Sequence, residues 1–296
     1  MILPARSSMG RVTLAATAGT PRARALSAAL REARISSGIG VRALARQLEL
    51  SHVQISNWET GSRVPDVETV AMILAAIRVS PAERERILDI ARNVREPNWL
   101  TVGMNGIPQQ LAGVVECERA AKSIVEWTPM AIPGLLQTTE YTRAIKETGG
   151  LPQTDIELRV MLSASRREVV TRQDPVHFHA LISAAALHEP IGRDGVMLEQ
   201  LKHLVAMAGR PNIAIQIVPL RIGWHPGWAG PFVLYEFPDT SPVVHFEHHS
   251  SGAFIPAEHD VVEYQKAVEY LCGVAMDEVE SVDHIGEVID HMEGAP

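Results

Sequence analysis

Residues 41–65 of the chain read VRALARQLELSHVQISNWETGSRVP, and their pattern indicates how the N-terminal part folds. The spacing predicts two short helices joined by a tight turn. In VRALARQL, apolar residues recur at helical intervals and can bury one face, while Arg42 and Arg46 remain outside. In the second helix, Ile55 and Trp58 favour packing through one side. The pattern therefore predicts a helical hairpin whose other faces meet solvent.

The two ends of the second helix carry local signals. Ser51 followed by Gln54 is the S/T-x-x-E/Q capping box, which satisfies free amides at the start of a helix. Gly61 can end the helix in the left-handed conformation. A helix that packs through two apolar residues and offers small polar side chains elsewhere suits the major groove of DNA. The alternative is a helical hairpin with no role in binding nucleic acid.

The segment LARQLELSHVQISNWETG, followed by RVP and the apolar run VETVAMILAAI, resembles the repressor-type (XRE-like) helix-turn-helix. The shared features are a small alanine on the first helix, the Ile-x-x-Trp-Glu-x-Gly ending, and Pro65 at the start of the next helix. The similarity covers about residues 22–80. It implies a domain that binds double-stranded DNA with a recognition helix, about residues 52–60, in the major groove.

Matched position by position, the resemblance implies specific roles. It assigns the reading of bases to Ser51, His52, Val53 and Asn57. Asn57 can pair with adenine through two hydrogen bonds, and Val53 can touch a thymine methyl group. Phosphate contacts, which position the domain without reading sequence, are expected from Arg42, Arg46 and Arg63. Arg31 and Arg34, in a helix expected at residues 22–34, are also available to phosphates. For each position the alternative is an ordinary surface residue.

Charge is distributed unevenly along the chain. The net charge is −8, but residues 1–63 carry nine Arg and three Glu, a balance of +6. Residues 101–296 carry 13 Lys and Arg against 26 Asp and Glu, a balance of −13. A basic N-terminal part in front of an acidic body puts the phosphate-binding surface where the helix-turn-helix is predicted.

The composition is typical of a soluble protein with two domains, at 296 residues, 46% apolar content and a mean hydropathy of +0.03. No run of about 18 apolar residues is present, so we expect no membrane-spanning segment. Residues 1–21 lack the apolar stretch of a signal peptide and are expected to be a disordered arm, with Met1 or Met9 as the true start. Cys117 and Cys272 are isolated, which favours a reducing cytoplasm.

The sequence predicts a multi-domain fold: an all-α helix-turn-helix domain at residues 22–93, a linker at 94–108, and an α+β domain at 109–296. We expect the α+β domain to hold a small, mostly antiparallel sheet. Short β-rich runs indicate strands at residues 176–182, 213–218, 231–237 and 243–248. Helical spacing continues from residue 111 to Ile124. Thr154 is expected to cap one long helix that ends near Thr171.

Four motifs stand out in the C-terminal half: IPGLLQT with EY, NIAIQIVPL with the glycine- and histidine-containing loop after it, PFVLYEF, and VVHFEH. They are similar to the C-terminal domain of actinobacterial antitoxin-like regulators. This resemblance implies a transcriptional regulator that often sits beside a small acidic partner protein. We expect the domain to dimerise and to sense a small-molecule effector or a partner. The competing hypothesis is an antitoxin-like interaction module whose main role is to hold a small partner protein.

A homodimer on a palindromic operator is expected for a separate reason. One short recognition helix contacts too few base pairs for useful specificity. Two such helices, one helical turn of DNA apart, contact enough.

The loop GWHPGW, residues 223–228, places Trp224, His225 and Trp228 in a short Gly/Pro segment before a strand. Exposed aromatics of this kind favour contact with a ligand or partner, and buried capping of a sheet edge is the alternative.

Five histidines lie within 35 residues: His225, His245, His248, His249 and His259. In the strand VVHFEH, His245, Glu247 and His249 would share one face. The spacing matches no strong ligand pattern, so no metal is predicted. No G-x-S-x-G elbow, phosphate loop or dinucleotide fingerprint is present. The prediction is therefore a protein with no catalytic residues and no cofactor.

Overall fold

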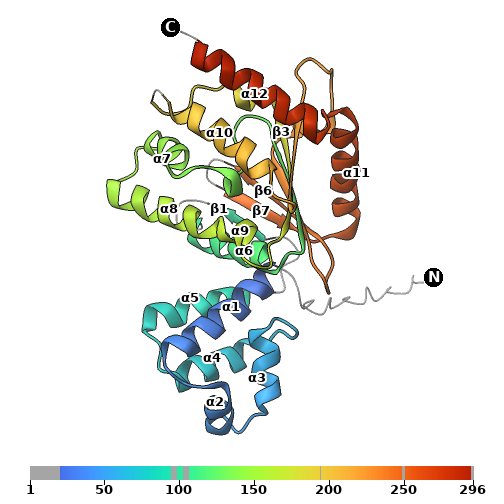
Figure 1. The fold of residues 1–296 in the computed structure, drawn as a ribbon. Coiled ribbons are helices and arrows are strands. Elements are labelled where there is room, and N and C mark those ends of the chain that lie inside the picture. Colours follow the sequence, from blue (N-terminus) through green and yellow to red (C-terminus); the bar gives the residue numbers. More distant parts are fainter. Residues whose placement is uncertain (1–20, 95–98, 103–106, 194, 249–250, 295–296) are drawn as a thin grey trace, which may run out of the picture. The chain divides into compact units, whose positions relative to one another are not determined.

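The computed structural model of the chain describes residues 21–94, 99–102, 107–193, 195–248 and 251–294. The chain divides into two compact units, Met1–Glu96 and Pro97–Pro296, which we call unit 1 and unit 2 (Figure 1). Among the described residues, no helix combines the length and the apolar character needed to span a membrane.

Unit 1 is all-helical, as the sequence predicts. Its helices are α1 (Pro21–Ser36), α2 (Val41–Gln47), α3 (His52–Glu59), α4 (Val67–Ala76) and α5 (Pro81–Arg92). Local signals set where three of these helices begin. The side chains of Ser51, Asp66 and Ser80 each accept a backbone N–H in the first turn of α3, α4 and α5, respectively.

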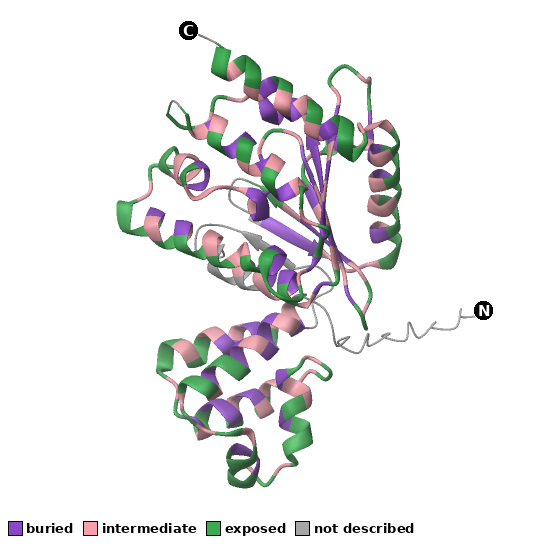
Figure 2. Cartoon of the chain, viewed as in Figure 1, coloured by how far each residue is buried: buried purple, intermediate pink, exposed green. Residues whose placement is uncertain are grey.

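One apolar core joins the helices of unit 1. Its fully buried members include Leu26, Leu30, Leu44, Ile55, Leu74 and Ile87. Burial of one such side chain contributes about 1.5–3 kcal/mol. In Figure 2 the buried positions lie along the inner sides of these helices. Because Ile55 is the member from α3, its burial determines which side of α3 is turned to solvent.

Unit 2 contains a seven-stranded sheet among its described residues, in the order β1-β7-β6-β5-β2-β3-β4. The strands are β1 (Trp99–Val102), β2 (Ser123–Thr128), β3 (His177–Ser183), β4 (Ile213–Val218), β5 (Phe232–Glu236), β6 (Val243–His248) and β7 (Ser251–Ile255). At one end, β2, β3 and β4 run parallel. From β2 through β5, β6 and β7 to β1 the neighbours are antiparallel. The expectation of a small, mostly antiparallel sheet was therefore wrong, because the sheet is larger and mixed.

Three strands account for the difference. Helical spacing was expected to continue to Ile124, but the helix ends at Ala120 and Ser123–Thr128 form β2. Its apolar residues continue the helical spacing by coincidence, and pairing with β3 and β5 decides the strand. Residues 99–102, expected in the linker, form β1 by pairing with β7, which was not predicted either. Such long-range pairing leaves little trace in local sequence.

The helices of unit 2 are α6 (Ile107–Ala120), α7 (Thr139–Glu147), α8 (Gln153–Arg166), α9 (Glu168–Thr171), α10 (Val196–Ala208), α11 (Glu258–Val274) and α12 (Glu278–Gly294). Short 3₁₀ turns η2 (Gly134–Leu136), η3 (Ala184–Leu187) and η4 (Pro226–Ala229) lie between them. Figure 1 shows α6 to α9 on one side of the sheet and α11 on the other. The single long helix expected up to Thr171 is two helices, α8 and α9, and the residue before α8 is Pro152 rather than Thr154.

Candidate nucleic-acid interface

The start of α3 is fixed by a complete capping box. The Ser51 hydroxyl accepts the backbone N–H of Val53 at 3.2 Å, and the Ser51 N–H donates to Oε1 of Gln54 at 3.1 Å. The Gln54 side-chain carbonyl is thus occupied by the cap, as the sequence predicts. At the other end Gly61 has a φ of +78°, the left-handed conformation predicted for the residue that ends this helix.

The predicted base-reading residues lie on the solvent side of α3. Ser51, His52 and Val53 are exposed, and 51% of the apolar Val53 side chain is open to solvent. Asn57 is half-buried, and its backbone carbonyl accepts the N–H of Arg63 at 3.1 Å. Val53 and Asn57 lie four residues apart and therefore neighbour each other on one face. The exposed Ser56 lies on the same side of the helix.

The three arginines expected at phosphates are also exposed. Arg42 and Arg46 lie one turn apart on α2, and Arg63 follows α3. Within the described part of the chain, none of the three forms an ion pair, since the salt bridges of unit 1 join other residues. Their guanidinium groups are therefore open to an external anion. Arg31 is likewise exposed.

Arg34 was expected to be available to phosphates, and this was wrong. Its Nε lies 2.6 Å from Oε1 of Glu59, and its Nη2 lies 2.8 Å from Oε2. Its Nη1 donates to the backbone carbonyl of Ile39 at 2.9 Å. The hydrogen bond to Glu59, more than the Coulomb attraction between the two charges, raises the pKa of Arg34. Glu59 belongs to the Trp-Glu-x-Gly ending of the motif, but sequence reasoning gave it no role because its partner lies on another helix.

The three candidate residues in the loop at residues 223–228 of unit 2 differ in their exposure to solvent. Trp224 and Trp228 are 78% and 69% exposed, whereas His225 is buried. The His225 ring packs edge-on against Trp127, with centroids 5.7 Å apart, and Nε1 of Trp127 donates to the Gly227 carbonyl at 2.9 Å. A Cβ on Gly227 would lie 2.7 Å from the Trp127 ring. The loop is thus fastened to the sheet while both tryptophans remain open to solvent.

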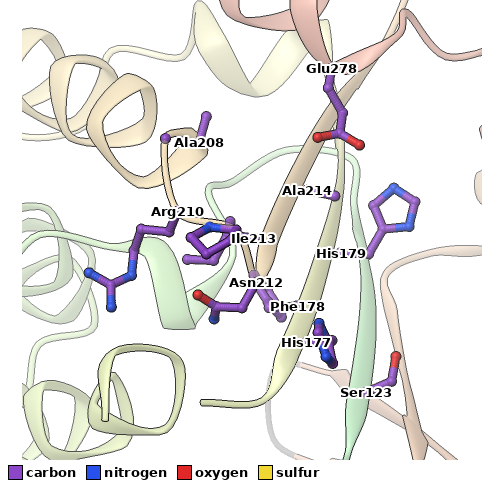
Figure 3. Close-up of a pocket in the computed structure, with 12 residues that line it drawn as sticks. Ser123, His177, Phe178, His179, Ala208, Arg210, Asn212, Ile213, Ala214 and Glu278 are labelled. Carbon is purple, nitrogen blue, oxygen red and sulfur yellow. The ribbon is translucent and has the colours of Figure 1, made fainter. Parts of the chain in front are cut away.

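A hollow of about 420 Å³ lies at the amino ends of β2, β3 and β4 (Figure 3). Ser123, His177, His179 and Glu278 line one part of it, and the Arg210 side chain extends away from them. Nε2 of His179 lies 2.8 Å from Oε1 of Gln216, and burial lowers the pKa of this histidine.

The C-terminal histidines that the structure describes lie in different surroundings. His245 packs on Phe254 with ring centroids 4.4 Å apart, and burial lowers its pKa to about 3, so the ring is neutral. His248 is exposed, and His249 lies outside the described residues. Among the described residues, no group of three or more His, Cys, Asp or Glu side chains is arranged to hold a metal ion.

The two helices α2 and α3, the capped turn between them and the packing of both onto α1 and α4 define a helix-turn-helix protein. In agreement, residues 25–87 match the family model of a helix-turn-helix domain. Residues 111–287 match the model of a domain of unknown function, DUF5753. That match covers more than half of the chain, and the chain belongs to the DUF5753 family. Comparison with curated proteins gives no significant match.

Proposed function

We propose that the chain is a sequence-specific DNA-binding regulator of transcription, which inserts α3 into the major groove. The observation that carries the proposal is the solvent face of α3. Its N-terminal residues Ser51, His52 and Val53 are exposed, and unpaired arginines flank it on α2 and in the loop after α3 within the described part of the chain. Such a face, with a buried opposite side, is what a recognition helix requires. The match to a helix-turn-helix domain supports the same reading.

In this proposal, one set of residues reads the bases and another set binds the phosphates. His52 and Asn57 offer hydrogen bonds to base edges, and Val53 offers an apolar contact to a thymine methyl group. Arg42, Arg46 and Arg63 bind phosphates and set the position of the domain on the duplex.

The proposed regulator acts as a homodimer on a palindromic operator. The eight residues of α3 reach only a few base pairs, so a second copy of the helix is needed for useful specificity. Unit 2 would supply the dimer contact and sense a small molecule or a partner. In this proposal the protein binds DNA in the cytoplasm, needs no cofactor and is not an enzyme.

A second candidate function is that of an antitoxin-like interaction module, whose main role is to bind a small partner protein. The observation in its favour is the loop at residues 223–228, where Trp224 and Trp228 are exposed although the loop itself is firmly held. Exposed tryptophans on a fixed loop suit contact with another protein.

The experiment that tests the main proposal is selection of genomic DNA fragments by the full-length protein at two salt concentrations, followed by sequencing. A short palindrome retained at the higher salt is the expected result, since base contacts resist salt better than phosphate contacts do. Salt-sensitive binding without an enriched motif would contradict it and favour the interaction module. The matched control is a triple variant of His52, Val53 and Asn57 to Ala, which should retain DNA at low salt but enrich no motif.

A further inference from the structure

Helices α10 and α12 pack side by side in unit 2 (Figure 1). Their inner sides are buried, as at Leu204 of α10 and Ile285 of α12. On their outer side they form an open groove of about 630 Å³. Three apolar residues line this groove and are only half-buried: Val205, Val282 and Ile289. The two helices thus present an apolar strip that the core of unit 2 does not cover.

The middle of the groove is open because α12 has a glycine there. Gly286 comes four residues after Val282 and three before Ile289, so the three positions share one side of the helix. A Cβ at Gly286 would meet no atom within 4 Å. The neighbouring residues therefore leave room for a side chain, although glycine lowers helix stability relative to alanine. A glycine at this point allows another backbone to approach α12 closely.

The rim of the groove is acidic. Asp283, Glu287 and Asp290 line it and are exposed. Among the described residues, Asp283 and Asp290 form no ion pair. The cation among the lining residues is Lys202, and its Nζ lies 2.8 Å from a carboxylate oxygen of Glu293. Since Lys202 is already paired with an acid, the groove has an uncompensated negative rim beside its apolar strip.

This charge selects the kind of partner. A second copy of the chain is unsuited to the groove if it presents the same helix, because α12 contains six Asp and Glu residues and no Lys or Arg. Two copies would bring like charges together, which is unfavourable. A partner with Lys or Arg beside its apolar residues would instead be attracted to the rim.

The walls of the groove favour a helical partner over an extended one. An extended segment binds by adding a strand to a sheet edge, where unpaired main-chain groups meet it. Helices α10 and α12 use their main-chain groups internally, so an extended partner would find no such groups here. A helix satisfies its own main chain and can place a row of apolar side chains in a groove.

We propose that the groove between α10 and α12 binds an amphipathic, basic helix of a partner protein. Its apolar row would lie on Val205, Val282 and Ile289, and its Lys or Arg side chains would face Asp283 and Asp290. Burial of the apolar row supplies affinity, and the charges supply selectivity against acidic helices. This assignment rests on the proposed function in one respect, because it gives the chemistry of a partner that unit 2 would sense.

The test is selection of displayed peptides by the full-length protein in the absence of DNA. The library consists of helices of about 18 residues, long enough to form in isolation, with leucine at helical spacing and random Lys, Arg, Glu, Gln or Ala elsewhere. Enrichment of peptides with Lys and Arg beside the leucines is the expected result. Fluorescence anisotropy then measures the affinity of the best peptide, which should fall as salt rises, because exposed charges are screened.

A pair of glycine variants locates the binding site. Gly286→Leu places a side chain in the groove and should weaken binding of the best peptide by about tenfold or more. Gly273→Leu is the matched control, because a Cβ at this position of α11 would likewise meet no atom within 4 Å. It should leave the affinity unchanged. Circular dichroism without peptide checks that both variants are folded.

A pair of charge variants tests the rim. The double variant Asp283→Asn, Asp290→Asn should weaken binding by about two- to tenfold, the range expected for two exposed ion pairs. The control Glu258→Gln, Glu269→Gln removes two exposed charges from α11 and should leave the affinity nearly unchanged.

Three results would overturn the proposal: no peptide is enriched, the enriched peptides are neutral or acidic beside the leucines, or Gly286→Leu binds the best peptide as tightly as the wild type. Because no DNA is present, the outcome is separable from that of the DNA selection. A protein that binds basic helices at this groove but selects no DNA motif would contradict the proposed regulator alone.

Discussion

Arg34 and Glu59 form a two-pronged, nearly buried ion pair that ties α1 to the last residue of α3. The side chains are 12% and 8% exposed, and the two N···O distances are 2.6 and 2.8 Å. The same guanidinium group holds the loop before α2 through Ile39. One side chain therefore joins three segments that determine how α3 is presented.

Breaking this ion pair should lower the denaturant concentration at which unit 1 unfolds. Glu59→Leu leaves Arg34 buried without its counterion and should cost about 3–5 kcal/mol of unfolding free energy. The double variant Arg34→Met, Glu59→Leu should recover much of this loss, because no unpaired charge remains. Urea denaturation measures both. Arg92→Ala, which breaks the exposed pair with Glu85, is the control and should cost about 0–1 kcal/mol. Equal losses for Glu59→Leu and Arg92→Ala would contradict the role assigned to the buried pair.

Asn57→Ala should lower affinity for the selected operator by about 1–3 kcal/mol and leave the salt dependence of binding nearly unchanged, because we propose that this residue reads a base. Arg46→Ala should weaken binding to all sequences and reduce the salt slope by about 1 if, as we propose, its side chain contacts a phosphate. Fluorescence anisotropy across a salt series separates the two effects. The control is Arg84→Ala, an exposed arginine on α5. An Asn57→Ala protein that bound the operator as tightly as the wild type would remove α3 from its proposed role.

Gly227→Ala should destabilise unit 2, because the new methyl group would overlap the Trp127 ring and His225 at 2.7–2.9 Å. Overpacking of this kind costs about 1–3 kcal/mol. Trp224→Ala, in the same loop but 78% exposed, should leave Tm almost unchanged. Thermal melts of both variants test the close contact of Gly227 with Trp127 and His225. A Gly227→Ala protein as stable as the wild type would show that this contact is absent.

Glu126 should make unit 2 less stable as pH rises. Burial raises its pKa in the folded protein to about 7, above the ordinary value of 4.5 for a glutamate, so the folded state favours the protonated carboxyl group. The stability that this preference contributes is complete below the unfolded-state pKa and is lost as pH rises through the folded-state pKa.

Glu126→Gln, which cannot ionise, should therefore melt at a higher temperature than the wild type near about pH 8 and at a similar temperature near about pH 5. Glu147→Gln is the matched control and should show no such divergence. Melting curves of ligand-free protein across this range provide the measurement, and parallel curves for Glu126→Gln and wild type would rule out the enclosed position of Glu126.

Much of unit 1 could be predicted because its signals are local. The capping box at Ser51, the left-handed Gly61 and the apolar pair of α3 lie within one short stretch, and each acts on residues beside it. The face of α3 that meets solvent follows from the same spacing, since Ile55 has to be buried. The candidate base-reading residues could thus be named from the amino-acid sequence alone.

Unit 2 could be predicted only in part. Strands β3 to β6 carry β-rich runs and were found from sequence. Strands β1 and β2 depend on partners elsewhere in the chain, and β7, which pairs with its neighbour β6 as well as with β1, was missed. The separation of His225 from its two tryptophan neighbours depends on Trp127, whose hydrogen bond to Gly227 spans 100 residues. The ion pair between Glu118 of α6 and Arg166 of α8 likewise joins residues that are far apart in the chain.

The helix-turn-helix and its exposed face could be predicted from local sequence, because helix periodicity, capping and turn chemistry act between neighbours in the chain. That Arg34 is bound to Glu59, 25 residues away, rather than open to phosphate, is visible only in the folded structure. The mixed order of the sheet is likewise visible only there. Those features depend on contacts between distant residues, for which a single sequence carries no periodic signal.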